Sequence, residues 1–224
     1  MSLEEYRPIG TAMIAMMRRV ERLINRRLLP ALERREASAR GVVTDVITET
    51  WMAGATTGYM LHGAYLGAPA SMPPSLARAL AEQALHHGEW TAGRIRSALE
   101  QREIDGAALS DLARISSQVA LWRGHDVASR AVAGLTEAGY KRWVRSWPRK
   151  QQREHSVLEG QVLPEHMLYQ LPSGARVYGP RDWDRYPEPS EWINCGHALV
   201  YMRDVSAREV LYNPPSATMY TGGD

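Results

Sequence analysis

The residues in this sequence best suited to chemistry are a cysteine and two histidines in its last third. Cys195 and His197 are one residue apart, so a strand would place them on one face with Cα atoms about 6.5–7 Å apart. His155 lies forty residues before Cys195, and the intervening loop offers Asp182 or Asp184 as a fourth, oxygen ligand. Thiolate, imidazole and carboxylate groups are all ligands that zinc accepts. The sequence therefore predicts a structural zinc site at His155, Cys195, His197 and Asp182.

Two other interpretations of these residues are open. Cys195 is also suited to be a small buried hydrophobic side chain, with the histidines hydrogen-bonded in the core or at the surface. A nucleophilic dyad of Cys195 with His155 or His197 would need an activating environment, and no cysteine-enzyme signature surrounds them. The sequence has no serine nucleophile elbow, no phosphate-binding loop with lysine and no His-Glu-x-x-His motif. We therefore predict no catalytic residues and no enzymatic activity.

The N-terminal part of the chain is expected to begin with an amphipathic helix. Apolar residues recur every three or four positions, which predicts one apolar helical face, made of Met13, Met17, Val20, Ile24 and Leu28. Arg18, Arg22 and Arg26 fall on the opposite face. The helix either packs on its own domain or docks on a partner protein, and in the second case these three arginines are the predicted partner-binding residues.

Three more helices are expected before residue 139. The first covers residues 42–66, and a proline-rich break follows it. The second runs from Ser75, its predicted N-cap, to Arg102. Asp105-Gly106 predicts a turn, and the last helix spans residues 110–138 with Gly139 as its C′ residue.

The composition of the sequence changes after Gly139: tryptophan, proline and tyrosine become frequent, and the helical period of apolar residues is lost. Short β-like segments are expected near residues 142–147, 176–178 and 195–202. We predict an α+β protein, with a helical N-terminal two-thirds followed by a small loop-rich α+β module of short antiparallel strands. The predicted domains are residues 1–138, residues 139–204 and an extended C-terminal arm at residues 205–224.

Composition narrows the class of protein further. The chain has 224 residues, 44% of them hydrophobic, which is enough for one large domain or two small ones. A single cysteine excludes an internal disulfide framework. No apolar run approaches the roughly 20 residues of a membrane span, and no signal peptide is evident. We therefore expect a protein without a membrane partner.

Charge is distributed unevenly along the chain. Residues 1–153 carry 22 basic and 15 acidic side chains, and residues 154–224 carry 5 and 10. The densest basic stretch is residues 141–153, with six cations and no acid. Interleaved tryptophans make it a candidate for nucleic-acid contact, through Lys141, Arg142, Arg145, Arg149 and Lys150. A solvated strand edge, where cations discourage edge pairing, is the alternative, and the modest net charge of +2 argues against nucleic acid as the main partner.

Four ordered motifs in the last third resemble the phage Mu F-type head morphogenesis module. They are residues 139–144 (Gly-Tyr-Lys-Arg-Trp-Val), 153–162 (Arg-Glu-His-Ser-Val-Leu-Glu-Gly-Gln-Val), 180–182 (Pro-Arg-Asp) and 193–195 (Ile-Asn-Cys). In that family a tryptophan-containing strand precedes Arg-x-x-His-x-x-Leu-(Asp/Glu)-Gly, a Pro-x-Asp loop follows, and Asn-Cys-x-Cys closes the module. This chain matches the second pattern from His155 to Gly160, and its Arg153 stands one residue closer to the histidine than in the family. The resemblance spans residues 139–202, and His197 stands where the family has its second cysteine.

The resemblance implies a minor head protein of a tailed bacteriophage. Such proteins associate with the portal and with the scaffold or major capsid protein during assembly, in the host cytoplasm, and remain inside the virion head near the portal. One alternative is a phage-encoded enzyme, of nuclease, protease or toxin type, that carries a Mu F-like module. The other is an internal virion protein that contacts packaged DNA.

Overall fold

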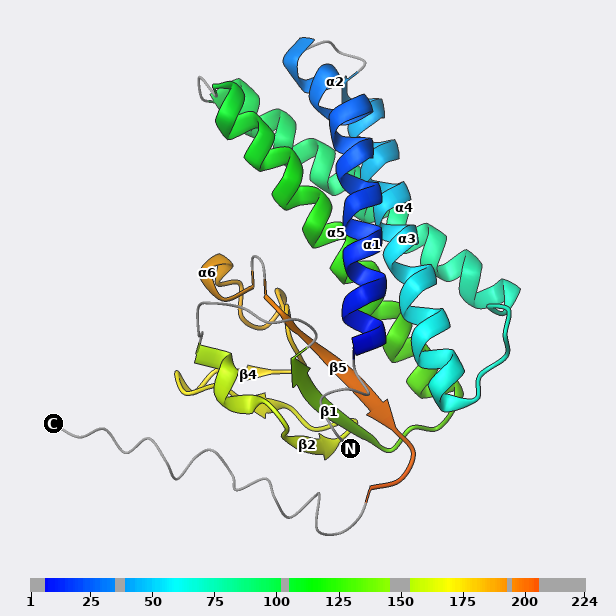
Figure 1. Ribbon diagram of the computed structural model, residues 1–224. Helices are drawn as coiled ribbons and strands as arrows, with labels where there is room; N and C mark the ends of the chain where they lie inside the picture. The colour runs from blue at the N-terminus through cyan, green and yellow to red at the C-terminus, as the bar shows by residue number, and fades with distance from the viewer. Residues whose placement is uncertain (1–6, 35–38, 102–104, 146–153, 193–194, 206–224) are drawn as a thin grey trace, which may run out of the picture. The chain divides into compact units, whose positions relative to one another are not determined.

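A computed structural model of the chain describes residues 7–34, 39–101, 105–145, 154–192 and 195–205 (Figure 1). Helices occupy the N-terminal two-thirds and short antiparallel strands follow, which confirms the predicted α+β fold. Beyond residue 205, the predicted C-terminal arm lies outside the described residues. None of the described helices is both long enough and apolar enough to span a membrane.

Contacts divide the chain into two compact units. The described parts of residues 11–60 and 69–129 form the helical unit, while those of residues 7–10, 61–68 and 130–205 belong to the strand unit. The division falls within three helices, α1 (Arg7–Leu23), α3 (Ala39–Leu66) and α5 (Gly106–Leu135). The domain boundary expected between residues 138 and 139 stays a prediction.

The first helix is interrupted by a π-helical turn. It consists of α1 (Arg7–Leu23), the turn η2 (Ile24–Leu28) and α2 (Leu29–Arg34). Leu29 N–H donates to the Ile24 carbonyl, one residue further back than in an α-helix. Pro30 follows directly and has no N–H to donate, so the regular hydrogen-bond ladder is broken here in any case. The predicted apolar face is buried at Met13, Val20, Ile24 and Leu28.

The third long helix, α4 (Pro74–Gln101), begins one residue before the predicted N-cap, Ser75. Proline is favoured at the first helical position because its missing N–H would have no intrahelical partner there. The Ala77 N–H closes the first turn by donating to the Pro73 carbonyl at 2.9 Å. Ser75 therefore lies inside the helix.

Both ends of α5 differ from the prediction. The helix begins at Gly106, and the Asp105 carboxylate accepts a hydrogen bond from the Ala108 N–H at 2.7 Å, so the expected turn is in fact the N-cap. At the other end Glu137, with φ of 52°, occupies the left-handed C′ position predicted for Gly139. The Ala138 N–H then donates to the Ala133 carbonyl at 2.9 Å and closes the helix two residues earlier than expected.

Removing the α5 cap tests this assignment. We expect Asp105→Ala to lower the free energy of unfolding by about 1 kcal/mol, because the Ala108 N–H loses its acceptor. Urea denaturation followed by circular dichroism measures the change. Asp111→Ala is the control, since its ion pair with Arg114 is solvent-exposed and contributes little. Equal stabilities of the two variants would contradict the capping role of Asp105.

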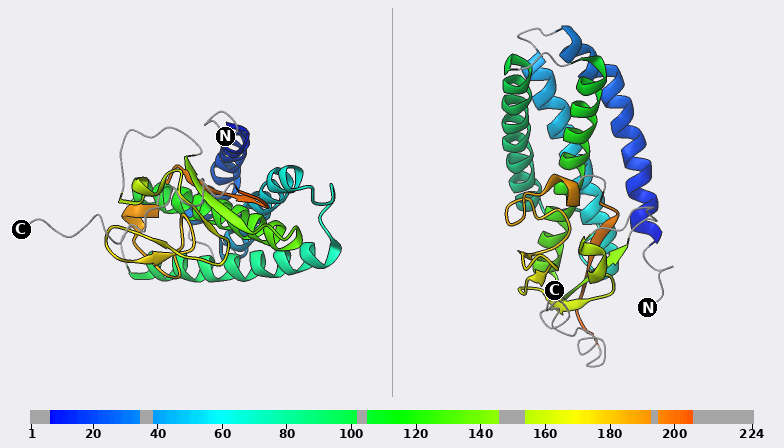
Figure 2. Two further views of the ribbon diagram at one scale, coloured as in Figure 1. Left: turned by 90° about the horizontal axis from the view of Figure 1, so that it is seen from below. Right: turned by 90° about the vertical axis from the view of Figure 1, so that its left-hand side faces the viewer.

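The strand unit contains a three-stranded antiparallel sheet of order β2-β1-β5, whose strands are labelled in Figure 1 and seen from two further sides in Figure 2. Its strands are β1 (Tyr140–Arg145), β2 (Val162–Pro164) and β5 (His197–Met202). A separate two-stranded sheet pairs β3 (Tyr169–Gln170) with β4 (Arg176–Val177). Because β1 is the central strand, the prediction that its cations mark a solvated strand edge is wrong.

Candidate metal centre

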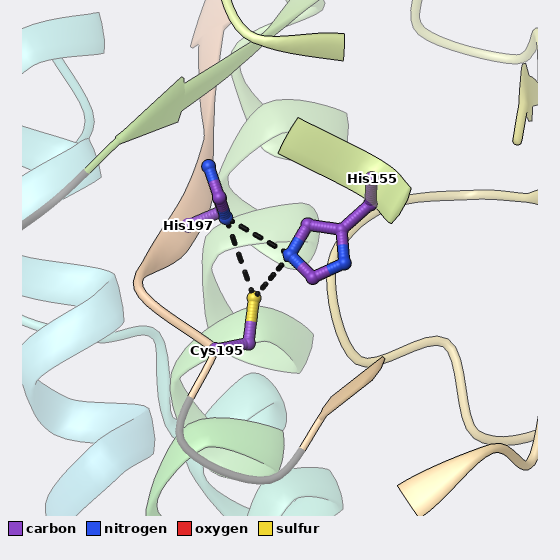
Figure 3. Close-up of side chains that lie close together, drawn as sticks. All are labelled: His155, Cys195 and His197. Atoms are coloured by element: carbon purple, nitrogen blue, oxygen red, sulfur yellow. Dashed lines mark hydrogen bonds between the residues drawn. The ribbon is translucent and has the colours of Figure 1, made fainter. Parts of the chain in front are cut away.

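Three separate segments of the strand unit carry the predicted ligands (Figure 3). His155 lies in the short 3-10 helix η3 (Glu154–Leu158), and His197 is the first residue of β5. Cys195 precedes that strand, in the connection from α6 (Pro189–Trp192), where its N–H donates to the Trp192 carbonyl at 3.0 Å. The strand expected from residue 195 thus begins two residues later, yet the three side chains still converge.

The ligand atoms form a small triangle. His155 Nε2 lies 3.0 Å from His197 Nδ1 and 3.2 Å from Cys195 Sγ, and His197 Nδ1 lies 3.6 Å from the same sulfur. Exposed fractions are 0%, 2% and 5% for His155, Cys195 and His197, so solvent scarcely reaches the group. The predicted convergence of these three residues is therefore present in the structure.

Each imidazole ring has one glutamate at the nitrogen that faces away from the cluster. Glu191 Oε2 lies 2.7 Å from His155 Nδ1, and Glu159 Oε1 lies 2.7 Å from His197 Nε2. Since an ionised carboxylate only accepts hydrogen bonds, each of these ring nitrogens carries the proton. Histidines that bind metals usually have such a carboxylate partner. Sequence reasoning missed both glutamates, although Glu159 stands four residues after His155 and Glu191 four residues before Cys195.

Hydrogen bonds also fix the charged groups next to the His197 ring. The Arg145 guanidinium donates to Glu159 at 2.8 Å. Burial alone would raise the pKa of Glu159, but the hydrogen bonds from Arg145 and His197 hold that pKa below its usual value. Burial lowers the pKa of His197, against the opposing effect of Glu159. Both effects favour a neutral imidazole next to an ionised carboxylate.

Aromatic side chains pack around the histidines. The centroid of the Trp192 ring lies 5.1 Å from that of His155, and the centroid of Trp143 lies 5.8 Å from it. Both tryptophans are buried. The apolar surroundings strengthen electrostatic interactions inside the cluster and keep bulk water away from it.

Asp182, the predicted fourth ligand, does not join this group. Its Oδ2 accepts a hydrogen bond from the Tyr178 N–H at 2.7 Å and pairs with Arg185 at 3.2 Å. The carboxylate therefore closes the loop that follows β4. Among the described residues, the group that could hold a metal ion consists of His155, Cys195 and His197.

The predicted nucleic-acid residues are mostly unsuited to that role. Lys141 and Arg142 are buried at 0% and 9% exposure, on opposite faces of β1, both of which are covered. Arg145 is half-buried and engaged with Glu159. The prediction of phosphate contacts is therefore wrong for Lys141 and Arg142. Arg149 and Lys150 lie outside the described residues.

The predicted partner-binding arginines are placed as the helical period requires. Arg18, Arg22 and Arg26 are all exposed, opposite the buried apolar face. Within the described part of the chain, the ion pairs of this helix come instead from Arg19 and Arg27, which reach Glu49 on α3. Three guanidinium groups are thus left facing solvent, and their role in binding stays a prediction.

No protein-family model matches this chain, and no significant match is found among curated proteins or solved structures.

Proposed function

We propose that this chain is a minor head protein of a tailed bacteriophage, which binds the portal during head assembly and stays inside the virion near it. The scaffold or major capsid protein is the second proposed partner. One observation carries the proposal: the described residues of the four motifs that resemble the Mu F-type module all belong to the strand unit, and hydrogen bonds link several of them.

Two contacts connect motifs directly, and a third connects the Pro-x-Asp loop to His197. The Gly160 N–H, from the second motif, donates to the carbonyl of Trp143 in the first at 2.8 Å. His155, also of the second motif, meets Cys195 of the fourth. Arg181, of the Pro-x-Asp loop, donates to the carbonyl of His197 at 2.7 Å, just after the fourth motif. The motif residues thus support one another as parts of a single folded module.

The helical unit is the proposed contact with the portal. Its first helix buries an apolar face and exposes Arg18, Arg22 and Arg26, which suits an acidic partner surface. The enzymatic alternative finds less support, because Cys195 is only 2% exposed and a nucleophile must reach its substrate. We therefore favour an interaction protein without catalytic residues of its own.

Capture by the portal tests the proposal. The chain is co-expressed with the portal protein of the same phage, and we expect the two to co-purify and the chain to be present in purified heads. Changing Arg18, Arg22 and Arg26 together to Gln is expected to lower capture by about tenfold, a loss of about 1.4 kcal/mol in binding free energy. Quantitative immunoblotting of the captured fraction provides the measurement.

The matched control replaces three exposed arginines of α4, Arg78, Arg94 and Arg96, with Gln. This variant has the same change in net charge and should be captured normally. Equal loss in both triple variants would reject the docking role of the first helix. A wild-type chain that elutes apart from the portal and is absent from heads would overturn the proposed function.

A further inference from the structure

Two ring nitrogens and one sulfur face one another in the buried triangle of ligand atoms. His155 Nδ1 and His197 Nε2 donate their protons to Glu191 and Glu159 on the far side of the rings. The opposite nitrogens, His155 Nε2 and His197 Nδ1, therefore point toward Cys195 Sγ and lie 3.0 Å from each other. A bound cation could accept an electron pair from each of these three atoms.

The size of the triangle suits a first-row metal ion. Zinc bonds of about 2.0 Å to nitrogen and 2.3 Å to sulfur, at tetrahedral angles, place two nitrogens about 3.3 Å apart and nitrogen and sulfur about 3.5 Å apart. The corresponding separations here are 3.0 Å for the two nitrogens, and 3.2 and 3.6 Å for nitrogen and sulfur. Shifts of a few tenths of an ångström in the three ligand atoms would therefore make room for the ion.

From this geometry we propose that His155 Nε2, Cys195 Sγ and His197 Nδ1 bind one Zn²⁺ per chain. Two imidazoles and a thiolate suit zinc, whereas magnesium and calcium prefer oxygen ligands. Glu191 and Glu159 orient the two rings and supply the negative charge that a buried dication requires. On binding, Cys195 loses its proton to solvent and its sulfur forms the bond to zinc.

The role of this ion is structural. It joins η3 to the connection between α6 and β5, two segments about forty residues apart that the small sheets connect only in part. The three ligands are 0–5% exposed, so a substrate in solution would have little access to the ion, which favours a structural role. Because the unfolded chain does not hold these ligands together, zinc binding stabilises the folded strand unit. This inference holds whether or not the chain is a head protein.

The wild-type chain provides the most direct test. The untagged full-length protein is purified without chelators, and we expect one zinc per chain by elemental analysis. X-ray absorption at the zinc edge should show one sulfur at about 2.3 Å and nitrogen ligands at about 2.0 Å. Removal of the metal with a strong chelator should lower the melting temperature, and added Zn²⁺ should restore it.

Variants assign the ligands. Cys195→Ser and His197→Ala should lose zinc, while His166→Ala, which changes an exposed histidine outside the cluster, should keep it. Since ligand variants can fail to fold, Glu191→Gln serves as a milder change that leaves all three ligands in place. Its zinc affinity should fall by about 10- to 100-fold in competition with a chromophoric chelator.

Three outcomes would overturn the site. One is a purified chain without stoichiometric zinc whose melting temperature changes neither with chelator nor with added Zn²⁺. Another is a zinc absorption spectrum without a sulfur ligand. The third is a Cys195→Ser protein that keeps zinc as tightly as the wild type. None of these outcomes bears on capture by the portal, so the proposed function is tested separately.

Discussion

A single methyl group added at Gly124 is expected to destabilise the helical unit severely. A Cβ at this position would lie 2.0 Å from the Trp51 carbonyl oxygen, 2.9 Å from its carbon and 3.0 Å from the Ala55 nitrogen. All three are backbone atoms of α3, so no side chain can rotate away and the two helices must separate. We expect Gly124→Ala to lower the free energy of unfolding by at least about 4 kcal/mol, a large part of the usual 5–15 kcal/mol.

The contact is reciprocal, which allows the same prediction for the facing helix. A Cβ on Gly54 of α3 would lie 1.9 Å from the Leu121 carbonyl oxygen on α5. Gly54→Ala should therefore destabilise the unit about as much as Gly124→Ala. Because both substitutions disturb one interface, the double variant should lose less than the sum of the two single losses.

Gly93→Ala is the matched control, since a Cβ there meets no atom within 4 Å and the residue lies within α4. Alanine forms helix more readily than glycine, so this variant should gain up to about 1 kcal/mol. Urea unfolding followed by circular dichroism measures the stability of wild type, of the Gly124 and Gly54 variants and of the Gly93→Ala control. A Gly124→Ala chain as stable as wild type would contradict the close approach of α3 and α5.

The second large effect is a pH dependence that arises from Lys141. This side chain is fully buried on β1, where its Nζ donates to the Tyr178 carbonyl at 2.9 Å and lies 3.2 Å from the centre of the Tyr178 ring. Burial lowers its pKa from 10.5 to about 7. The charged groups that also act on it are Glu165 and Asp182, which raise the pKa, and Arg130 and Arg185, which lower it.

The direction of the effect follows from proton counting. In the unfolded chain Lys141 keeps its ordinary pKa of 10.5, so between pH 7 and 10.5 the unfolded state binds a proton that the folded state lacks. The free energy of unfolding therefore rises with pH in this window, by about 1.4 kcal/mol per unit. Below pH 7 both states are protonated and the contribution no longer changes.

Comparison with Lys141→Met isolates this contribution. From pH 7 to 9.5, below the range where the buried tyrosines contribute, wild type should gain about 3 kcal/mol relative to the variant. Arg176→Met, which removes an exposed cation from β4, should retain the wild-type pH profile. Denaturant titrations at each pH provide the measurement. Parallel pH profiles for wild type and Lys141→Met would show that the lysine is protonated in the folded chain at neutral pH.

Helices were the most predictable part of this protein. The spacing of apolar residues placed the first helix and its arginine face correctly, because the period of 3.6 residues acts over a few neighbouring positions. The residues at which helices begin and end were predicted less accurately than the helices themselves. Pro74, Asp105 and Glu137 take terminal positions that single-residue preferences assigned elsewhere, since several nearby residues compete for each end.

The zinc ligands were only partly predictable. His155, Cys195 and His197 stood out because few other side chains combine nitrogen and sulfur ligands, and these three do converge. Asp182 has an equally suitable carboxylate, but a backbone N–H and Arg185 occupy it. Glu159 stood in the second motif, but neither it nor Glu191 could be assigned to a histidine, because glutamates are common and only the folded chain decides which of them reach one.

By itself the sequence determined the α+β class, the amphipathic first helix and the residue types available for a metal centre, all of which depend on local pattern and intrinsic chemistry. Tertiary structure alone decided that both faces of β1 are covered, which buries Lys141 and Arg142 and removes them from contact with phosphate. Neighbouring side chains of a strand point to opposite faces of the sheet, so a charged one meets solvent only where nothing packs on its face. That packing brings together residues far apart in the chain, and no local pattern records it.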